Sequence, residues 1–360
     1  MTTSPYSNHN KTLVLKEEEY SIWKYEGVPE EVISFFEQTN WGSAGAVYER
    51  KNSSELVRQL KAPYLFAIQK EEEIVGTAVF CHTTPLVLGV PYNCYIIRYF
   101  AASPLIQGKK IIKHYAGKVM EVVRDAETEK TIYVGCVEKG NIRSYKVVEN
   151  AGYEPLGLLG VNAFSRFFPK EQNNIERIQT ESSKKKVLEL LNTFYVNHVL
   201  VHFDYLFLRD NYFVIRENGE IVVGCQFHRV HWAINKMPGF MGKLIMRVLP
   251  NIPFISKLFN PRRFEFLAFE GIYFKPGYEQ TLLNLFEGLL HQEGMNSALF
   301  WMGENCPYRK KIQQHGNLGL MQYFVKDAGV YIMTSYRNMG EEEITLLKSG
   351  PLYASAFDYI

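Results

Sequence analysis

Residues 95–110 read YIIRYFAASPLIQGKK, and the order of elements along the chain follows from this segment. Residues 95–102 are aromatic or aliphatic apart from one arginine, which is typical of a buried strand. The turn Gln107-Gly108-Lys109-Lys110 leads into a helix with one apolar face, formed by Ile112, Tyr115, Val119 and Val122. A turn at a helix N-terminus offers backbone N–H groups to an anion, so this turn is either an anion site or an ordinary surface turn that begins a helix.

An internal repeat flanks this segment. Residues 64–76 read YLFAIQKEEEIVG, and residues 212–224 read YFVIRENGEIVVG. In both copies a tyrosine opens an apolar run, and a glycine follows it 12 positions later. The polar centre of each copy predicts a β-hairpin, most strongly at Asn218-Gly219 in the second.

A second pair of matching segments lies further along each half. Residues 131–153 and 297–318 both contain an apolar strand, an asparagine, a short helical pattern and a glycine. Asn141 precedes Gly152 by 11 positions, and Asn305 precedes Gly316 by 11. Asparagine before a helix and glycine after it are the preferred end residues, so we predict a capped helix in each half. The second half also has an amphipathic helix, formed around Leu282, Leu285, Phe286 and Leu289.

Strands and helices alternate in both halves, which predicts an α/β fold with a mixed sheet. We place one domain at 1–168 and a more divergent one at 174–340, with the polar stretch 168–175 between them. The second half carries an apolar, Met-rich and basic insertion at 236–263. Residues 341–360 form a C-terminal extension that we expect to pack on one domain.

Composition excludes several classes of protein. A chain of 360 residues predicts two domains, and a net charge of +2 gives no reason to expect nucleic acid as a partner. Five cysteines without a CxxC motif indicate reduced thiols. The N-terminus does not resemble a signal peptide, and no apolar run is long enough to span a membrane. We therefore expect a cytoplasmic protein without integral membrane association.

The order of elements resembles the GNAT N-acetyltransferase fold. The segment 95–104 is similar to the family's fourth strand entering its pyrophosphate loop, and 132–137 is similar to its fifth strand. Asn141 and Gly152-Tyr153 match the residues that begin and end the family's next helix. The likeness in motifs covers about 60 residues, whereas the likeness in topology covers most of the chain. Tandem GNAT proteins, such as those with mycothiol-synthase-like or N-myristoyltransferase-like architectures, have this organisation.

The resemblance implies an enzyme that transfers an acyl group from acyl-CoA, with acetyl-CoA expected, to the primary amine of a small molecule or peptide. It requires no metal. The first half would hold the cofactor, and the second would shape the acceptor pocket. The residues implied for acyl-CoA binding are Phe100, Ala101, Ala102, Gln107, Gly108, Lys109, Lys110 and Asn141.

The resemblance also suggests catalytic and substrate-binding residues. The family's tyrosine acid falls on Val148, and Tyr145 lies near it on the same helix face, either as a proton donor or as a packing residue. Glu270 lies within an apolar strand, either as a general base or as a carboxylate at a strand end. Arg98 and His228 are candidates for contact with substrate.

Two alternatives remain open. Lys110 and Ile112 stand where the family has glycines, so the chain can also be a catalytically silent module that binds CoA, another ligand or a protein. The insertion 236–263 forms a lid, a surface that touches a membrane or an acyl chain, or a buried helical cap, which we favour. A metal site at Cys225, His228 and His231 is not expected, because His228 faces the opposite side of a strand from the other two.

Overall fold

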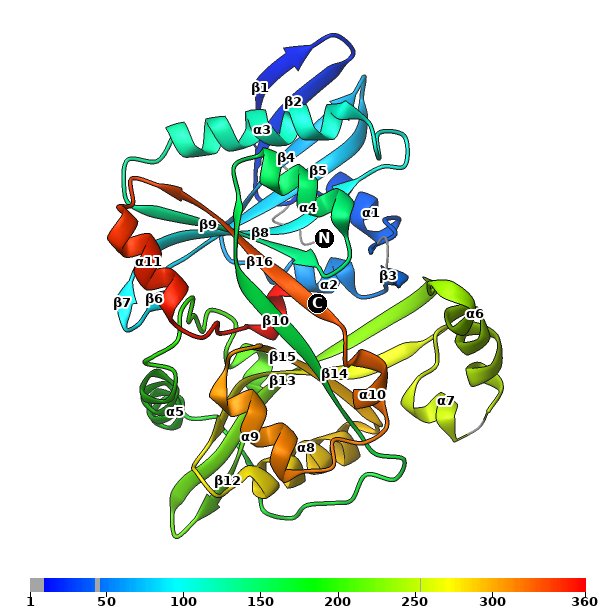
Figure 1. Ribbon diagram of the computed structural model, residues 1–360, viewed down its shortest axis with the longest axis vertical. Helices are drawn as coiled ribbons and strands as arrows, with labels where there is room; N and C mark the ends of the chain where they lie inside the picture. The colour runs from blue at the N-terminus through cyan, green and yellow to red at the C-terminus, as the bar shows by residue number, and fades with distance from the viewer. Residues whose placement is uncertain (1–9, 43–45, 253) are drawn as a thin grey trace, which may run out of the picture. The chain divides into compact units, whose positions relative to one another are not determined.

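The computed structural model describes residues 10–42, 46–252 and 254–360. The chain divides into two compact units. The first unit comprises residues up to Thr84, Tyr92–Leu156 and Tyr331–Ile344. The second comprises Pro85–Pro91, Gly157–Val330 and Thr345–Ile360. Figure 1 gives the elements of both.

The first unit has a sheet with the strand order β1-β2-β4-β5-β8-β9-β16. The pairs from β1 to β8 are antiparallel, and β8 pairs with β9 in parallel. Its strands are β1 (Lys11–Glu17), β2 (Tyr20–Glu26), β3 (Val47–Arg50), β4 (Pro63–Lys70), β5 (Glu73–Thr83), β8 (Asn93–Ala102), β9 (Thr131–Glu138) and β16 (Gly329–Arg337). Its helices are α1 (Glu30–Glu37), α2 (Ser53–Val57), α3 (Lys110–Asp125) and α4 (Ile142–Asn150).

Helix α3 covers the sheet of the first unit with one apolar stripe. Its buried residues are Ile112, Tyr115, Val119, Met120 and Val123, and they pack with Ile22, Phe66 and Tyr133 of the strands. Our prediction that Val122 belongs to this stripe is wrong, because Val122 is exposed. Successive helix residues turn by about 100°, which carries Val122 off the face that Val119 and Val123 share.

The second unit has a sheet with the order β10-β15-β14-β13-β12-β11. Strands β14 and β15 are parallel, and the pairs β10·β15, β13·β14, β12·β13 and β11·β12 are antiparallel. The strands are β10 (Glu154–Ser165), β11 (Ile175–Arg177), β12 (Tyr212–Glu217), β13 (Glu220–Lys236), β14 (Phe264–Phe274) and β15 (Ser297–Gly303), with the separate hairpin β6 (Leu86–Val87) and β7 (Val90–Pro91). The helices are α5 (Glu181–Phe194), α6 (Gly239–Val248), α7 (Ile255–Leu258), α8 (Glu279–Glu293), α9 (Pro307–His315) and α10 (Met321–Val325), with the short 3₁₀ turns η1 (Leu208–Asp210), η2 (Leu249–Asn251) and η3 (Ala356–Asp358). Helix α11 (Glu341–Ser349) begins in the first unit and ends in the second.

Helices cover both faces of this second sheet. Phe213 and Ile215 of β12 pack in the cluster that contains α8, whereas Tyr212 and Val214 pack in the cluster that contains α5. This alternation is what a strand buried on both faces requires. The predicted α/β class with a mixed sheet is therefore confirmed.

The sequence repeat is visible in the elements. The predicted hairpins correspond to β4–β5 and β12–β13, and the apolar residues of α8 are buried as expected. Asn141 caps α4 by accepting a hydrogen bond from the Ser144 N–H at 3.1 Å, as predicted. The matching prediction for Asn305 is wrong, because α9 begins at Pro307 with Cys306 as its N-cap. Proline suits that first helical position, since it has no N–H to satisfy.

The two units do not follow the order of the chain. Most of β10, which ends the first half of the sequence, belongs to the second unit, and most of β16, which ends the second half, belongs to the first. The proposed limits 1–168 and 174–340 thus remain a prediction about the repeat in the sequence. All five cysteines are free thiols. Within the described residues, no helix is long and apolar enough to cross a membrane.

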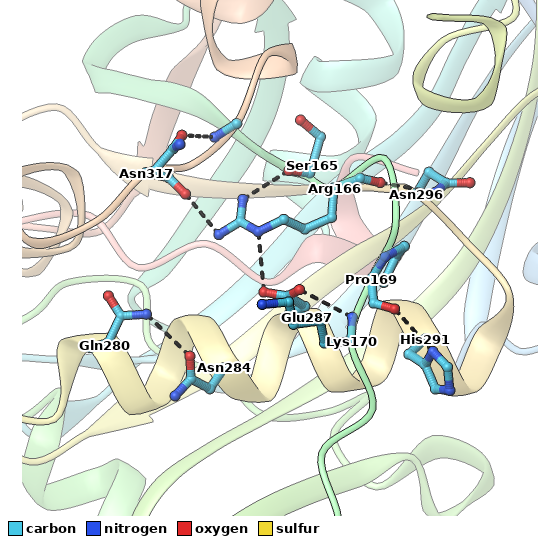
Figure 2. A network of polar contacts seen from close by, with 11 residues as sticks. Ser165, Arg166, Pro169, Lys170, Gln280, Asn284, Glu287, His291, Asn296 and Asn317 are labelled. Atoms are coloured by element: carbon cyan, nitrogen blue, oxygen red, sulfur yellow. Dashed lines mark hydrogen bonds and ion pairs between the residues drawn. The ribbon is translucent and has the colours of Figure 1, made fainter. Parts of the chain in front are cut away.

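The segment after β10 is anchored to α8 through Glu287 (Figure 2). The Glu287 carboxylate accepts hydrogen bonds from Arg166 Nε at 3.2 Å and from the Lys170 N–H at 3.1 Å. The Arg166 guanidinium also donates to the Asn317 carbonyl at 2.9 Å, and His291 Nδ1 lies 3.0 Å from the Pro169 carbonyl. The polar stretch that we expected to be a linker therefore packs on a helix of the second unit.

Glu287→Ala should destabilise the protein by about 1–3 kcal/mol, because it leaves the half-buried Arg166 guanidinium and the Lys170 N–H without their acceptor. Urea unfolding measures the change in the free energy of unfolding. Gln280→Ala is the matched control on the same helix, since exposed Gln280 bonds only across one turn to Asn284. Equal stabilities of the two variants would contradict an anchoring role for Glu287.

Candidate functional site

A bulge interrupts β8 in the first unit at the place where the sequence predicts a cofactor. Thr77 pairs with Ala101 and Val79 pairs with Arg98, so Tyr99 and Phe100 together lie opposite Ala78. Tyr99 has a φ of +48°, and its carbonyl accepts a hydrogen bond from Thr77 Oγ1 at 3.1 Å. A bulge leaves one residue out of the ladder and turns its backbone groups to a new direction.

The bulge coincides with the end of pairing between β8 and β9. Their parallel register runs from Asn93 opposite Thr131 to Ile97 opposite Gly135, although β9 continues to Glu138. Residues 98–102 of β8 thus retain β5 on one side and part from β9 on the other. Backbone N–H and C=O groups at such an edge need partners from solvent or from a ligand.

The turn before α3 supplies the second part of this site. Gly108 has a φ of +76°, and a side chain at this position would meet no other atom within 4 Å. The N–H groups of Gln107 and Lys109 bond within the turn, to Ser103 and Ile106. Helix α3 has no side-chain cap at Lys109, so the N–H groups of its first turn are available to an anion.

The side chains of this turn leave the anion site accessible. Gln107, Gly108, Lys109 and Lys110 are exposed, and Gln107 Nε2 donates to the Ala102 carbonyl at 2.8 Å. Ile112 points into the core with Tyr115 and Val119, so it does not fill the turn. The turn therefore fits a diphosphate through its backbone amides and two lysine charges, in spite of the missing glycines.

Asn141 and Tyr145 lie on α4, which follows β9. The Asn141 side chain accepts its hydrogen bond from the Ser144 N–H of its own helix, so in the structure it caps α4. The Tyr145 ring packs edge-on against Tyr331 of β16, with ring centroids 5.7 Å apart. Tyr145 is half-buried at the rim of the core, on the same helix as Val148.

A polar cluster that the sequence analysis missed adjoins the bulge. Glu138, at the end of β9, accepts a hydrogen bond from Tyr48 Oη at 2.8 Å. The Arg50 guanidinium lies over the rings of Trp41 at 4.7 Å and of Tyr99 at 5.7 Å. Burial raises the pKa of Glu138 above its ordinary value, and the Tyr48 hydrogen bond and the Arg50 charge oppose that rise. The only signal in the sequence was a carboxylate that ends the fifth strand.

The second unit repeats the same backbone construction at Glu270. Its strand β14 pairs with β15 only at Leu267 and Ala268, and its register with β13 shifts between Gly224 and Gln226. Gly271 has a φ of +58°, which places a bulge directly after Glu270. Arg98 directly precedes the bulge of β8 in the same way, and both side chains are buried.

The Glu270 carboxylate is fully occupied by hydrogen bonds. Its Oε1 accepts from Gln226 Nε2 at 3.1 Å and lies 3.2 Å from His228 Nε2, and its Oε2 accepts from Ser355 Oγ at 2.8 Å and from the Phe357 N–H at 3.2 Å. Burial alone would raise the pKa of Glu270, but the His228 charge and these hydrogen bonds outweigh it and hold the pKa at about 2. A carboxylate with that pKa is a weak base.

The C-terminal segment is the partner that Glu270 holds. Leu352, Tyr353 and Ala354 line a pocket together with residues of β14 and β15, namely Phe269, Glu270, Gly271, Ile272, Trp301 and Met302. The Tyr353 N–H donates to the Val199 carbonyl at 3.0 Å, and the Val199 N–H donates to the Pro351 carbonyl at 3.0 Å. In the second unit, the chain itself thus occupies the place where β14 and β15 part.

Two further contacts fix the segment. The Phe357 ring stacks on Tyr205 with a centroid distance of 3.9 Å. His202 Nε2 lies 3.0 Å from Asp358 Oδ2, and its Nδ1 lies 3.5 Å from Asp204. Burial would lower the pKa of His202, but the two aspartates raise it to about 9. His202 is therefore a cation at neutral pH, clamped between two carboxylates.

The predicted site residues thus fall into two groups. Arg98, Phe100, Ala101, Ala102, Gln107, Gly108, Lys109, Lys110, Asn141 and Tyr145 belong to the first unit, and His228 and Glu270 to the second. Among the described residues, no group of three His, Cys, Asp or Glu side chains converges as metal ligands would.

Comparison with known proteins finds a family likeness in the first half of the chain. Residues 30–153 match the model of the acetyltransferase (GNAT) family. No curated protein matches the sequence significantly.

The whole chain is similar in fold to Saccharomyces cerevisiae N-myristoyltransferase. A structure of that enzyme with bound myristoyl-CoA has a TM-score of 0.59 and 9% identity, and the match covers 94% of this chain and 87% of that one. A second structure, with myristoyl-CoA and inhibitors, has the same TM-score and identity and covers 90% and 82%. At this identity the likeness concerns the fold, and it confirms the GNAT-like architecture.

The folded pKa of Glu270 lies below its ordinary value of 4.5, so its contribution to stability is complete above pH 4.5 and disappears as the pH falls toward 2. Between pH 6 and pH 3 the wild type should therefore lose about 2 kcal/mol more than Glu270→Gln, in which this position no longer titrates. Urea unfolding at the two pH values measures the difference. The exposed Glu171→Gln is the control, and a Glu270→Gln protein with wild-type pH dependence would contradict the assignment.

Proposed function

We propose that the protein is an acyl-CoA-dependent N-acyltransferase that binds its acyl-CoA in the first unit. The observation that carries this proposal is the coincidence of three features within residues 98–112: a bulged strand, the end of its pairing with β9, and an uncapped helix behind a glycine turn. The family match over residues 30–153 supports the same reaction class.

Acyl-CoA would supply an activated thioester. The exposed turn at 107–110 would bind its diphosphate through the first amides of α3, with Lys109 and Lys110 adding charge. The backbone of Tyr99, Phe100, Ala101 and Ala102, where β8 has left β9, would donate a hydrogen bond to the thioester carbonyl oxygen as charge develops on it.

Proton transfer would use groups of the first unit. Glu138 would accept the proton of the attacking amine, because burial raises the pKa of this carboxyl toward the range useful for a base. Tyr145 would donate a proton to the leaving thiolate. In this proposal Glu270 is a positioning residue, since its low pKa and four hydrogen bonds suit an anchor better than a base.

The acceptor is proposed to be a primary amine on a small molecule or peptide, and acetyl is the first acyl group to test. The bound myristoyl-CoA in the similar yeast structures makes a long-chain acyl group the second. If the chain is a silent module, it will bind CoA or another ligand without transferring an acyl group.

Lys109→Glu/Lys110→Glu should weaken acyl-CoA binding by about 30-fold or more, because each reversed charge removes a charge-assisted contact to a phosphate. Calorimetry with acetyl-CoA and with myristoyl-CoA measures the affinities. Lys113→Glu/Lys118→Glu on the same helix is the control with the same change in charge. If neither CoA ester binds the wild type, the proposed function fails.

Glu138→Gln should lower kcat by about 10²–10⁴-fold and leave the affinity for acyl-CoA unchanged. Tyr48→Phe removes a hydrogen bond that lowers the pKa of Glu138, so it should move the acidic limb of the pH–rate profile to higher pH. The assay follows release of the CoA thiol with a panel of primary amines. Glu149→Gln, on the exposed side of α4, is the control. A full rate in Glu138→Gln would exclude this base.

A further inference from the structure

The insertion after β13 carries an unbalanced charge. Residues 236–263 contain six lysines and arginines and no aspartate or glutamate. One of the six, Arg263, pairs with Glu265 at 3.1 Å. The stretch as a whole is strongly basic even with this ion pair. A local excess of positive charge attracts anionic surfaces.

The insertion also exposes apolar side chains, and our expectation of a buried cap is wrong for α6. Phe240, Leu244 and Val248 are 80%, 44% and 39% exposed, and they follow one another at four-residue spacing along one helix face. Exposed Lys243 and Arg247 each precede a member of this row by one position, so they flank it. The opposite side holds buried Gly242.

Two further aromatic side chains are exposed beyond α6. Phe254, just before α7, and Phe168, in the segment after β10, are both exposed, and their rings meet edge-on at 6.4 Å. Lys257 Nζ lies 5.2 Å from the Phe168 ring, so basic and aromatic groups alternate here too. We call these residues, Phe240, Lys243, Leu244, Arg247, Val248, Phe254, Lys257 and Phe168, the α6–α7 face.

The α6–α7 face is held in place from within the second unit. Ser297 Oγ donates to the Leu258 carbonyl at 2.6 Å, and Leu258 is buried. The Ile234 N–H donates to the Pro261 carbonyl at 2.7 Å, which joins the two ends of the insertion. The Arg166–Glu287 contact of Figure 2 fixes the segment that carries Phe168. In Figure 1, α6 and α7 lie at the far ends of β13 and β14, away from α8 and α9.

We propose that the α6–α7 face docks on the surface of a membrane rich in anionic lipids. Apolar side chains flanked by basic ones match the boundary between acyl chains and negatively charged headgroups. The 10 residues of α6 are too few to span a bilayer, so the helix lies in the interface. The positive charge of the face favours anionic lipid. It disfavours a protein surface that has few acidic residues, and it disfavours a second copy of this basic stretch.

Co-sedimentation of the full chain with vesicles tests the proposal. The protein should bind vesicles of phosphatidylcholine mixed with phosphatidylserine, release at high salt, and bind pure phosphatidylcholine weakly. Lys243→Glu/Arg247→Glu should weaken binding at least 10-fold, because each basic residue near such a surface contributes about fivefold. Phe240→Ser/Leu244→Ser should also weaken it, even at low salt.

Tyr323→Ser is the matched control, since Tyr323 is 79% exposed but lies on α10. A tryptophan at position 240 (Phe240→Trp) should shift its emission to the blue on vesicle binding, and one at 323 (Tyr323→Trp) should not. Failure of the wild type to bind mixed vesicles would overturn the proposal, as would equal loss in the control. Vesicle binding needs no acyl transfer, so this test stands apart from the proposed function.

Discussion

In each unit of this protein, two neighbouring parallel strands stop pairing partway through the sheet. Their backbone amides and carbonyls then need other hydrogen-bond partners, and both units are organised around that requirement. In the first unit β8 leaves β9 after Ile97, at a bulge marked by the positive φ of Tyr99. In the second unit β14 leaves β15 after Ala268, at a bulge marked by Gly271. The two units differ in what lies at this interruption of the pairing.

In the second unit the C-terminal segment of the chain lies at the place where β14 and β15 part. Residues 351–357 bond to Val199 and to Glu270, and the buried ion pair between His202 and Asp358 holds the end of the segment. In the first unit the turn at 107–110 is exposed and α3 is uncapped. This difference is the physical reason for our proposal that acyl-CoA binds in the first unit, because the chain itself lies at the corresponding place in the second.

The residues that precede the two bulges differ between the units, in agreement with this contrast. Glu270 anchors the C-terminal segment, whereas Arg98 at the matching position cannot accept hydrogen bonds from a backbone. The Glu270 carboxylate, predicted as a base in the second half, accepts hydrogen bonds from the C-terminal segment. Glu138, half-buried near the first bulge, has an environment that raises the pKa of its carboxyl.

The repeat, the hairpins and the helix α4 with its cap were predictable because each depends on local spacing and turn chemistry. Glu138 was not, because its environment is created by Tyr48 and Arg50 of β3, far away in the sequence. The anchoring of Glu270 by Ser355 and Phe357 spans 85 and 87 positions, which no local pattern reports. The exposure of α6 was not predicted, because an apolar helix pattern indicates burial and the sequence does not show whether another element covers the helix.

Hydrogen exchange of the full chain, with and without saturating acyl-CoA, tests the central claim most directly. The account predicts that acyl-CoA slows exchange of the backbone amides in residues 98–112 and leaves residues 269–282 unchanged. Protection of 269–282 instead, or release of the C-terminal segment 351–360 on binding, would contradict it.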